Sequence, residues 1–336
     1  MTTIVFVSNA DSGEIGVYRL DAERGELAPI QTLAVGGQVM PLAQSPDRRF
    51  LYAARRSDPL EVLSFAIDPQ CGALAAIGTA PLPHSMANIA SDRSGRWLFS
   101  ASYGGNVIAV SAIGADGVPQ PAHQIMATAP HAHAIQADPS NRFVFAPCLG
   151  GGHVMQLRFD AATGNLTPNE PPLFVPHAGA SPRHLVFDAA GGFAYLLNEL
   201  DGAIDVLALD ATAGTLRTVQ TLSSLPPGFD AEPWAADLHL SADGRFLYSS
   251  ERRSSTLAAF RVDPASGELT PLGHAPTEAQ PRGFAITPDG AFLIAAGQLS
   301  NRLSVHAIDA HTGALTRRSS CAAGGNPNWI EIVVLG

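Results

Sequence analysis

The sequence predicts an all-β protein, a seven-bladed β-propeller built from residues 1–336 as a single domain. Three observations support this prediction. Short apolar runs rich in Val, Ile, Leu and Phe alternate with turns, while no stretch keeps the 3.6-residue periodicity of an amphipathic helix. Two turn motifs also recur along the whole chain. Their period is near 48 residues, with about four strands in each unit, which is typical of propeller blades.

The first motif is a turn followed by a strand that begins with an aromatic residue. It occurs six times, with the aromatic residue at Phe50, Trp97, Phe143, Phe193, Phe246 and Phe292. Successive copies are 47, 46, 50, 53 and 46 residues apart. A spacing this regular indicates one copy in each successive blade.

The second motif is a strand that ends in Asp, a glycine turn and a further short strand. It occurs seven times, with one degenerate copy, and its glycines are Gly25, Gly72, Gly117, Gly164, Gly214, Gly267 and Gly313. An acid before a glycine is what such turns favour sterically. We therefore assign six acids to turns and not to a metal array: Asp21, Asp68, Asp160, Asp210, Asp263 and Asp309.

The unequal counts of the two motifs predict how the ring closes. The aromatic motif is missing only at the N-terminus, where the strand 4–9 enters without a preceding turn. The inner strand of that unit is then supplied by residues 329–334 near the C-terminus. We expect four-stranded blades, one of them shared by the N- and C-terminal strands, which leaves few exposed sheet edges.

Composition excludes several functions. The formal net charge of −10 argues against nucleic acid and anionic membranes as partners. All twenty basic residues are arginine, which excludes lysine Schiff bases and P-loop chemistry and leaves cations suited to carboxylate or phosphate. Three separated cysteines suit a reducing compartment, and no run reaches the roughly 18 apolar residues of a membrane helix. We expect a cytoplasmic monomer or weak homodimer.

Unusual polar residues gather where a propeller would place them together. The start of each inner strand and the end of each second strand share one face, at the mouth of the central channel. Starts of inner strands bring His131, His133, Arg183, His184, Asp237 and Arg282. Ends of second strands bring Asn9, Arg55, Tyr103, Cys148, Glu199, Glu251 with Arg252, and Gln298. This convergence predicts a pocket for a small, polar, anionic ligand.

The stretch 181–200 is the most informative of these. Two strands joined by a turn at 189–192 would bring Arg183 and Glu199 to the same sheet edge. Arg183 and Arg282 each follow a proline, which stiffens the approach to the strand. These arginines could clamp an anion or form buried ion pairs between blades. Glu199 could be a general acid or base, or only the partner of Arg183.

Histidines offer a second kind of chemistry. His131 and His133 alternate onto one side of a strand, but no third ligand stands at a suitable spacing, so we expect no metal. Proton transfer by His133 is favoured, because its pKa is expected near the working pH. His184 and His239 are weaker candidates that could simply be packing residues.

These motifs resemble the seven-bladed propeller lactonase family, which includes bacterial 6-phosphogluconolactonases of propeller type and fungal carboxymuconate cycloisomerases. The resemblance covers essentially the whole chain, and its specific segments are 182–187, 198–200, 234–239, 277–284 and 295–298. They are closer to the bacterial branch. The resemblance implies handling of a lactone without metal or cofactor, with catalytic roles for His133, Arg183, Glu199 and Arg252. From their place at the mouth we expect five residues to bind substrate: Arg282, His184, Asp237, Tyr103 and Gln298.

The expected reaction is hydrolysis of 6-phospho-glucono-1,5-lactone, a pentose-phosphate step, without a covalent intermediate. Glu199 or His133 would deprotonate the attacking water, an arginine would stabilise the oxyanion, and the other ionisable group would protonate the leaving ring oxygen. Arg252 and Arg282 would hold a phosphate or carboxylate. Attack by a substrate hydroxyl would instead isomerise the lactone.

Other functions stay open at this point. The substrate could be an unphosphorylated aldonolactone or galactonolactone, or a muconolactone. A calcium- or zinc-dependent sugar lactonase would need an oxygen-rich or histidine-rich cage. A non-catalytic binding propeller would tend to present exposed aromatic anchors, whereas the expected mouth is mostly charged with one tyrosine.

Overall fold

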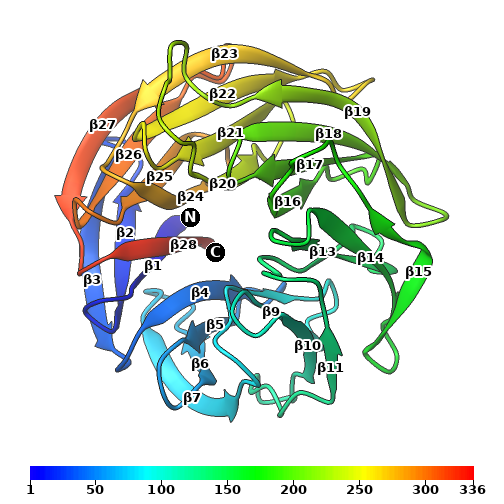
Figure 1. Cartoon of the computed structure of the whole chain (residues 1–336). Helices are drawn as coiled ribbons and strands as arrows, with labels where there is room; N and C mark the ends of the chain where they lie inside the picture. Colours follow the sequence, from blue (N-terminus) through cyan, green and yellow to red (C-terminus); the bar gives the residue numbers. More distant parts are fainter.

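Twenty-eight strands form seven four-stranded antiparallel sheets in the computed structural model, which describes residues 1–336. The sheets are arranged radially as the blades of a closed ring (Figure 1). The structure contains no helix, and therefore none that is long and apolar enough to cross a membrane. The predicted seven-bladed propeller is confirmed.

The strands of each blade run from the central channel outwards. Blade 1 consists of β28 (Pro327–Leu335), β1 (Thr2–Asn9), β2 (Glu14–Asp21) and β3 (Glu26–Ala34). Blade 2 consists of β4 (Val39–Gln44), β5 (Phe50–Arg55), β6 (Glu61–Ile67) and β7 (Leu74–Pro81). Blade 3 consists of β8 (Asn88–Ser91), β9 (Trp97–Ser102), β10 (Val107–Ala112) and β11 (Gln124–Ala127). Blade 4 consists of β12 (Gln136–Ala137), β13 (Phe143–Cys148), β14 (His153–Asp160) and β15 (Asn165–Phe174).

The remaining blades follow the same order. Blade 5 consists of β16 (Pro182–Phe187), β17 (Phe193–Asn198), β18 (Ala203–Asp210) and β19 (Thr215–Ser223). Blade 6 consists of β20 (Ala235–Leu240), β21 (Phe246–Glu251), β22 (Thr256–Val262) and β23 (Leu269–Pro276). Blade 7 consists of β24 (Pro281–Ile286), β25 (Phe292–Gly297), β26 (Arg302–Ile308) and β27 (Leu315–Ala322).

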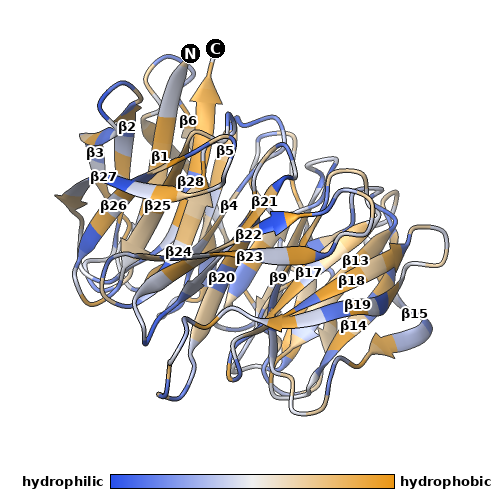
Figure 2. Cartoon of the chain, turned by 90° about the horizontal axis from the view of Figure 1, so that it is seen from above, coloured by the Kyte–Doolittle hydropathy of each residue, from blue (hydrophilic) through white to orange (hydrophobic).

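The ring closes through blade 1, as the sequence predicted. β28 pairs with β1 from Thr2↔Leu335 to Asn9↔Pro327. Both chain ends therefore lie on one face of the disc (Figure 2), and the end of β1 and the start of β28 lie on the opposite face. We call this opposite face the mouth face.

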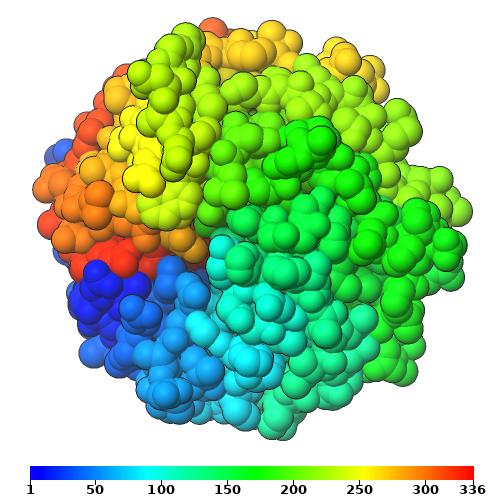
Figure 3. Space-filling model, in the orientation of Figure 1, coloured from blue at the N-terminus to red at the C-terminus, as the bar shows by residue number.

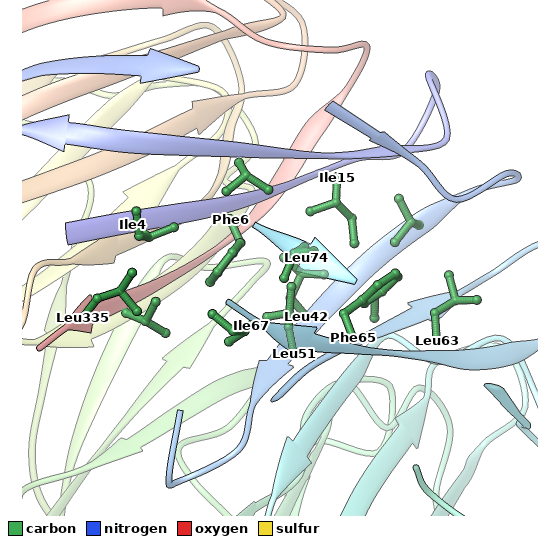
Figure 4. Packing of buried hydrophobic residues seen from close by; sticks show 14 residues of the cluster. Ile4, Phe6, Ile15, Leu42, Leu51, Leu63, Phe65, Ile67, Leu74 and Leu335 are labelled. Carbon is green, nitrogen blue, oxygen red and sulfur yellow. The ribbon is translucent and has the colours of Figure 1, made fainter. Parts of the chain in front are cut away.

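The hydrophobic core is divided among the joints between blades. Seven buried clusters occur, and each lies between two neighbouring sheets. Alternation along a strand serves two joints at once: Ile4 and Phe6 of β1 face blade 2 (Figure 4), whereas Val5 and Val7 face blade 7. A continuous apolar run in sequence is therefore the mark of a strand buried on both faces.

The two sequence motifs meet at these joints. Phe143 begins β13 of blade 4, and Gly214 of blade 5 lies so close to its ring that an added Cβ would overlap it. Gly214 has a φ of 68°, which glycine adopts without strain. The same contact joins Phe50 to Gly117, Trp97 to Gly164, Phe193 to Gly267 and Phe246 to Gly313, while Gly25 lies near Phe292 but closer to Arg318. Blade 1 lacks the aromatic motif, and Ile4 takes its place against Gly72.

The six turn acids have the role assigned to them. The Oδ1 atom of Asp68, for example, accepts the backbone N–H groups of Gln70 and Cys71 at 2.8 and 2.9 Å. Equivalent bonds form at the other five acids. They stabilise the turn that carries the interlocking glycine.

Candidate active site

A pocket of about 280 Å³ opens where the blades converge on the mouth face, toward the viewer in Figure 3. We call it the mouth pocket, and eight residues line it: Arg56, Ala87, Tyr103, His133, Glu199, Trp234, Arg252 and Arg282. The chain thus brings together five of the residues singled out from the sequence: Tyr103, His133, Glu199, Arg252 and Arg282. Their catalytic or binding roles stay predictions.

Half of the pocket comes from one repeated position. In four blades the second strand is six residues long, and the next residue lines the pocket: Arg56 after β5, Tyr103 after β9, Glu199 after β17 and Arg252 after β21. Each is therefore the sixth residue after the aromatic residue that begins its strand. Arg56 was missed because the neighbouring Arg55 was chosen. Arg55 turns away to Glu61, and the aromatic repeat already contained the correct register.

The inner strands contribute through β-bulges at the mouth. The pairing register of β16 shifts between Pro182 and His184, and that of β24 shifts between Pro281 and Gly283. Arg183 and Arg282 are the residues at these irregularities. A bulge re-aims a side chain that regular pairing would direct onto a sheet face. The repeated Pro-Arg sequence thus has the same local structure in two blades.

Glu199 is the only carboxylate of the mouth pocket, and two arginines hold it. Its Oε2 atom accepts from Nε of Arg183 at 2.7 Å and lies 3.0 Å from Nη2 of Arg252. Burial alone would raise the pKa of Glu199, but the charges of Arg183 and Arg252 outweigh it and hold the pKa below its usual value. Glu199 is therefore ionised at neutral pH.

His133 is a neutral imidazole in the ligand-free pocket. Its Nδ1 atom is buried without a hydrogen-bond partner, so Nε2 is the ring nitrogen left for a ligand. Burial, reinforced by Arg183 and His184, lowers its pKa well below the usual value. The expectation that His133 titrates near the working pH is wrong for the free protein, because the sequence showed neither how deeply the ring is buried nor how many cations surround it. The ring of Tyr103 packs edge-on to the ring of His133, with 5.9 Å between the ring centres, and stacks on the ring of His131, with 4.0 Å between the centres.

Arg252 is held in place by two backbone carbonyls and an aromatic ring. Its Nε and Nη2 atoms donate to the carbonyls of Trp234 and Ala235 at 3.0 and 3.2 Å, and its guanidinium carbon lies 3.8 Å from the centre of the Trp234 ring. Trp234 ends the segment 224–234, which joins β19 to β20 and stands above its neighbours on the face seen in Figure 3. Sequence reasoning missed Trp234, since it precedes its strand.

Arg183 lies beneath Glu199 and does not line the pocket. Its side chain is 1% exposed and donates to Glu199, to the Ala236 carbonyl and, at 3.2 Å, to Nε2 of His184. Of the two interpretations of Arg183, the structure shows a buried ion pair, although it lies within blade 5 and not between blades, and Arg183 does not line the pocket as an anion clamp would. An arginine this enclosed acts by holding Glu199.

Three predicted substrate-binding residues lie outside the mouth pocket. Gln298 donates to Asn326 at 2.8 Å and lines no part of the pocket, although it occupies the same position after its strand as Glu199. His184 and Asp237 lie behind the pocket in the central channel. Cys148 is buried in the core of blade 4, where burial raises its thiol pKa to about 11. The pocket lining does not support substrate contact by these residues.

The channel behind the pocket holds a second group of ionisable residues, named here the channel cluster: His184, Asp237, His239 and Glu331. Asp237 accepts from Nδ1 of His184 at 2.8 Å and from Nε2 of His239 at 3.1 Å. Burial opposes the charge of Asp237, but the two histidines hold its pKa below the usual value. Glu331 accepts from Trp329 and Gln44, and burial raises its pKa to about 7.

No group of three or more His, Cys, Asp or Glu side chains is arranged to hold a metal ion. His131, the possible partner of His133, is stacked on Tyr103 instead. What the mouth pocket combines is one ionised carboxylate, one neutral imidazole and several arginines. Such a set can activate water, stabilise an oxyanion and bind an anionic ligand.

Comparison with known proteins gives a consistent result. Residues 2–332 match the family described as Lactonase, 7-bladed beta-propeller. The chain is 43% identical over 335 residues to a 6-phosphogluconolactonase of Pectobacterium carotovorum subsp. carotovorum (strain PC1), with 100% of both chains covered. It is 41% identical to a 6-phosphogluconolactonase of Serratia proteamaculans (strain 568), with 99% of both covered. The structure of a periplasmic gluconolactonase of Pseudomonas aeruginosa superposes with a TM-score of 0.93 at 31% identity, covering 100% of both chains.

Proposed function

The chain belongs to the lactonase seven-bladed β-propeller family, and we propose that it hydrolyses the ester of a phosphorylated sugar lactone, 6-phospho-glucono-1,5-lactone. One observation carries the proposal: a single carboxylate and a neutral imidazole share a small pocket with three arginines. The names of the Pectobacterium and Serratia relatives support the same substrate.

The proposed mechanism follows from the positions of the groups. Glu199 or His133 takes a proton from a water molecule, whose oxygen attacks the lactone carbonyl. Arg252, which reaches both the pocket and Glu199, stabilises the negative charge that develops on the carbonyl oxygen. The C–O bond to the ring oxygen then breaks, and the group that took the proton, or its neighbour, protonates that oxygen. The carboxylic acid product ionises, so each turnover releases one proton.

The substrate's own charge assists this chemistry. In the free pocket the arginines lower the pKa of Glu199, and burial together with the arginines lowers that of His133, which makes each a weak base. A bound phosphate dianion offsets part of that positive potential and therefore raises both pKa values. The pocket thus gains basicity when the phosphorylated substrate is present.

The test is a comparison of substrates. Proton release is measured with 6-phospho-glucono-1,5-lactone, glucono-1,5-lactone and galactono-1,4-lactone, with and without EDTA, and corrected for spontaneous ring opening. We expect a strong preference for the phosphorylated ester and no effect of EDTA. Failure to accelerate opening of any lactone would contradict the proposal and favour a binding propeller.

A second candidate is hydrolysis of an unphosphorylated aldonolactone. The Pseudomonas aeruginosa relative is described as a gluconolactonase, and its structure covers the whole chain. Turnover restricted to the unphosphorylated sugars in the same assay would favour this candidate. Isomerisation between five- and six-membered lactones would appear as rearranged lactone without proton release.

We also propose that the enzyme is cytoplasmic. Its three cysteines, Cys71, Cys148 and Cys321, form no disulfide, which suits a reducing compartment. The Pseudomonas aeruginosa relative is described as periplasmic, so the compartment is a point on which the two would differ. Cell fractionation followed by immunodetection tests this assignment, and detection in the periplasm would overturn it.

A further inference from the structure

The four arginines around Glu199 fall into two pairs. Arg183 and Arg252 both direct nitrogen atoms at Oε2 of Glu199, and backbone carbonyls occupy much of their remaining donor capacity. Arg56 and Arg282 have no acidic partner. Glu199 is the only Asp or Glu among the lining residues, so it cannot neutralise all four cations.

Arg282 is the most exceptional of them. Its guanidinium makes no hydrogen bond or ion pair with the rest of the chain, and the side chain is partly exposed where it lines the pocket. Burial lowers its pKa, and the nearby charges of Arg183 and Arg56 lower it further. A guanidinium has five N–H donors, and in Arg282 all five are left to donate to a ligand or to water in the pocket.

The guanidinium of Arg56 is oriented by two contacts, but no acid neutralises its charge. Its Nε donates to Oγ of Ser85 at 2.9 Å, and its Nη1 lies 3.0 Å from Sδ of Met40. Neither partner carries a charge, and burial lowers the pKa of Arg56 as well. These two contacts fix the direction of the guanidinium while Nη2 is left without a partner in the chain.

We propose that Arg56 and Arg282 form a phosphate clamp that sets the preference for phosphorylated over unphosphorylated lactones. The proposal deepens the proposed function and rests on it. Two adjacent guanidinium groups offer the planar donor geometry that phosphate oxygens match, and their two positive charges equal the charge of a phosphate dianion. Arg183 and Arg252, already engaged with Glu199, are left to the reaction centre.

The test uses Arg56→Gln and Arg282→Gln, which remove the charge at similar length, with Arg55→Gln as the matched control. Arg55 is the neighbour of Arg56 in sequence, but its guanidinium pairs with Glu61 outside the pocket. kcat/KM is measured on 6-phospho-glucono-1,5-lactone and on glucono-1,5-lactone. We expect either pocket variant to lower the ratio of the two values by about 10- to 100-fold, as for loss of a charged hydrogen bond. Arg55→Gln should leave the ratio within about twofold.

A binding measurement separates this proposal from the proposed function. Inorganic phosphate should raise the Tm of the wild-type protein and of Arg55→Gln, but not that of Arg56→Gln or Arg282→Gln. Retention of this pattern in a protein that hydrolyses no lactone would support the clamp and refute the proposed function. An equal loss of activity on both lactones in the pocket variants, with the phosphate-induced Tm shift preserved, would overturn the clamp and leave the lactonase standing.

Discussion

Two groups of ionisable side chains share the axis of the propeller, the mouth pocket around Glu199 and the channel cluster around Asp237. In the channel cluster the charge of Asp237 has two partners, His184 and His239, and Glu331 accepts two hydrogen bonds. In the mouth pocket three arginines face one carboxylate, and Arg282 has no partner at all.

The difference distinguishes two uses of buried charge. A buried charge that is paired and hydrogen-bonded can hold a structure in one arrangement. A partly exposed cation with no hydrogen-bond or ion-pair partner in the chain, such as Arg282, is instead free to bind an anionic ligand. Arg183 connects the two groups, because it bonds to His184 on one side and to Glu199 on the other.

The strongest test of this comparison is Glu199→Gln against His239→Gln. The amide of Gln cannot accept the proton, so we expect kcat/KM on the phosphorylated lactone to fall by about 10³-fold. His239→Gln changes a channel residue that bonds to Asp237 but does not line the mouth pocket, and kcat/KM should stay within about threefold. Both variants are checked for folding by circular dichroism. A larger loss from His239→Gln would place the chemistry in the channel instead.

Asp237→Asn tests whether the channel cluster supports the pocket from behind. The change weakens the bond that orients His184 and, through it, Arg183. We expect kcat to fall about tenfold, while KM changes less than twofold because no lining residue is altered. Steady-state kinetics separate the two effects. A rise in KM with unchanged kcat would instead assign Asp237 to substrate binding.

The pH dependence tests how the pocket responds to charge. The pKa of Glu199 is lowered in the free protein, so kcat/KM should persist as pH falls and decline only below the usual carboxylate range. Bound phosphate raises that pKa, so the acid limb of kcat should lie at higher pH than that of kcat/KM, by about one unit. Glucono-1,5-lactone carries no phosphate and should show a smaller separation. Equal separations for the two substrates would contradict substrate-assisted basicity.

The smallest expected effect is on stability. Arg282→Gln removes a partly buried charge that has no ion-pair partner, together with its repulsion from Arg183 and Arg56, so in phosphate-free buffer the Tm should rise by about 1–3 °C. Arg183→Gln breaks the buried bond to Glu199 and should lower the Tm. Thermal denaturation of both variants compares the two kinds of arginine directly. A lower Tm for Arg282→Gln would show that its charge is structurally partnered.

The fold was predictable because its signals repeat. Each aromatic residue that begins a second strand contacts a turn glycine of the next blade, so the same pair of residues recurs in the sequence at successive joints between blades. Even the missing copy was informative, since Ile4 replaces the aromatic ring where blade 1 begins. Packing contacts that repeat at a regular spacing along the chain can therefore be predicted from a single sequence.

The site was predictable in part, for physical reasons that differ between residues. Glu199, Arg252 and Tyr103 lie at a repeated position, and the repeat revealed them. Arg183 looked like Arg282, since both follow a proline at a bulge, yet only Arg183 has an acid within reach. The difference lies within the blades: Glu199 follows the second strand of blade 5, whereas Gln298 stands at that position in blade 7. Trp234 belongs to no repeat and could not be found by alignment of the blades.

Closure of the ring by β28 also sets an order of events during synthesis. The chain emerges from the ribosome with β1 first, and the strand that covers its inner edge is among the last to be made. Until then β1 presents an unpaired edge to other chains, and the channel lacks Trp329 and Glu331. A product that stops before β28 would therefore keep the edge of β1 open to pairing with other chains, and the ring would stay unclosed until β28 is made.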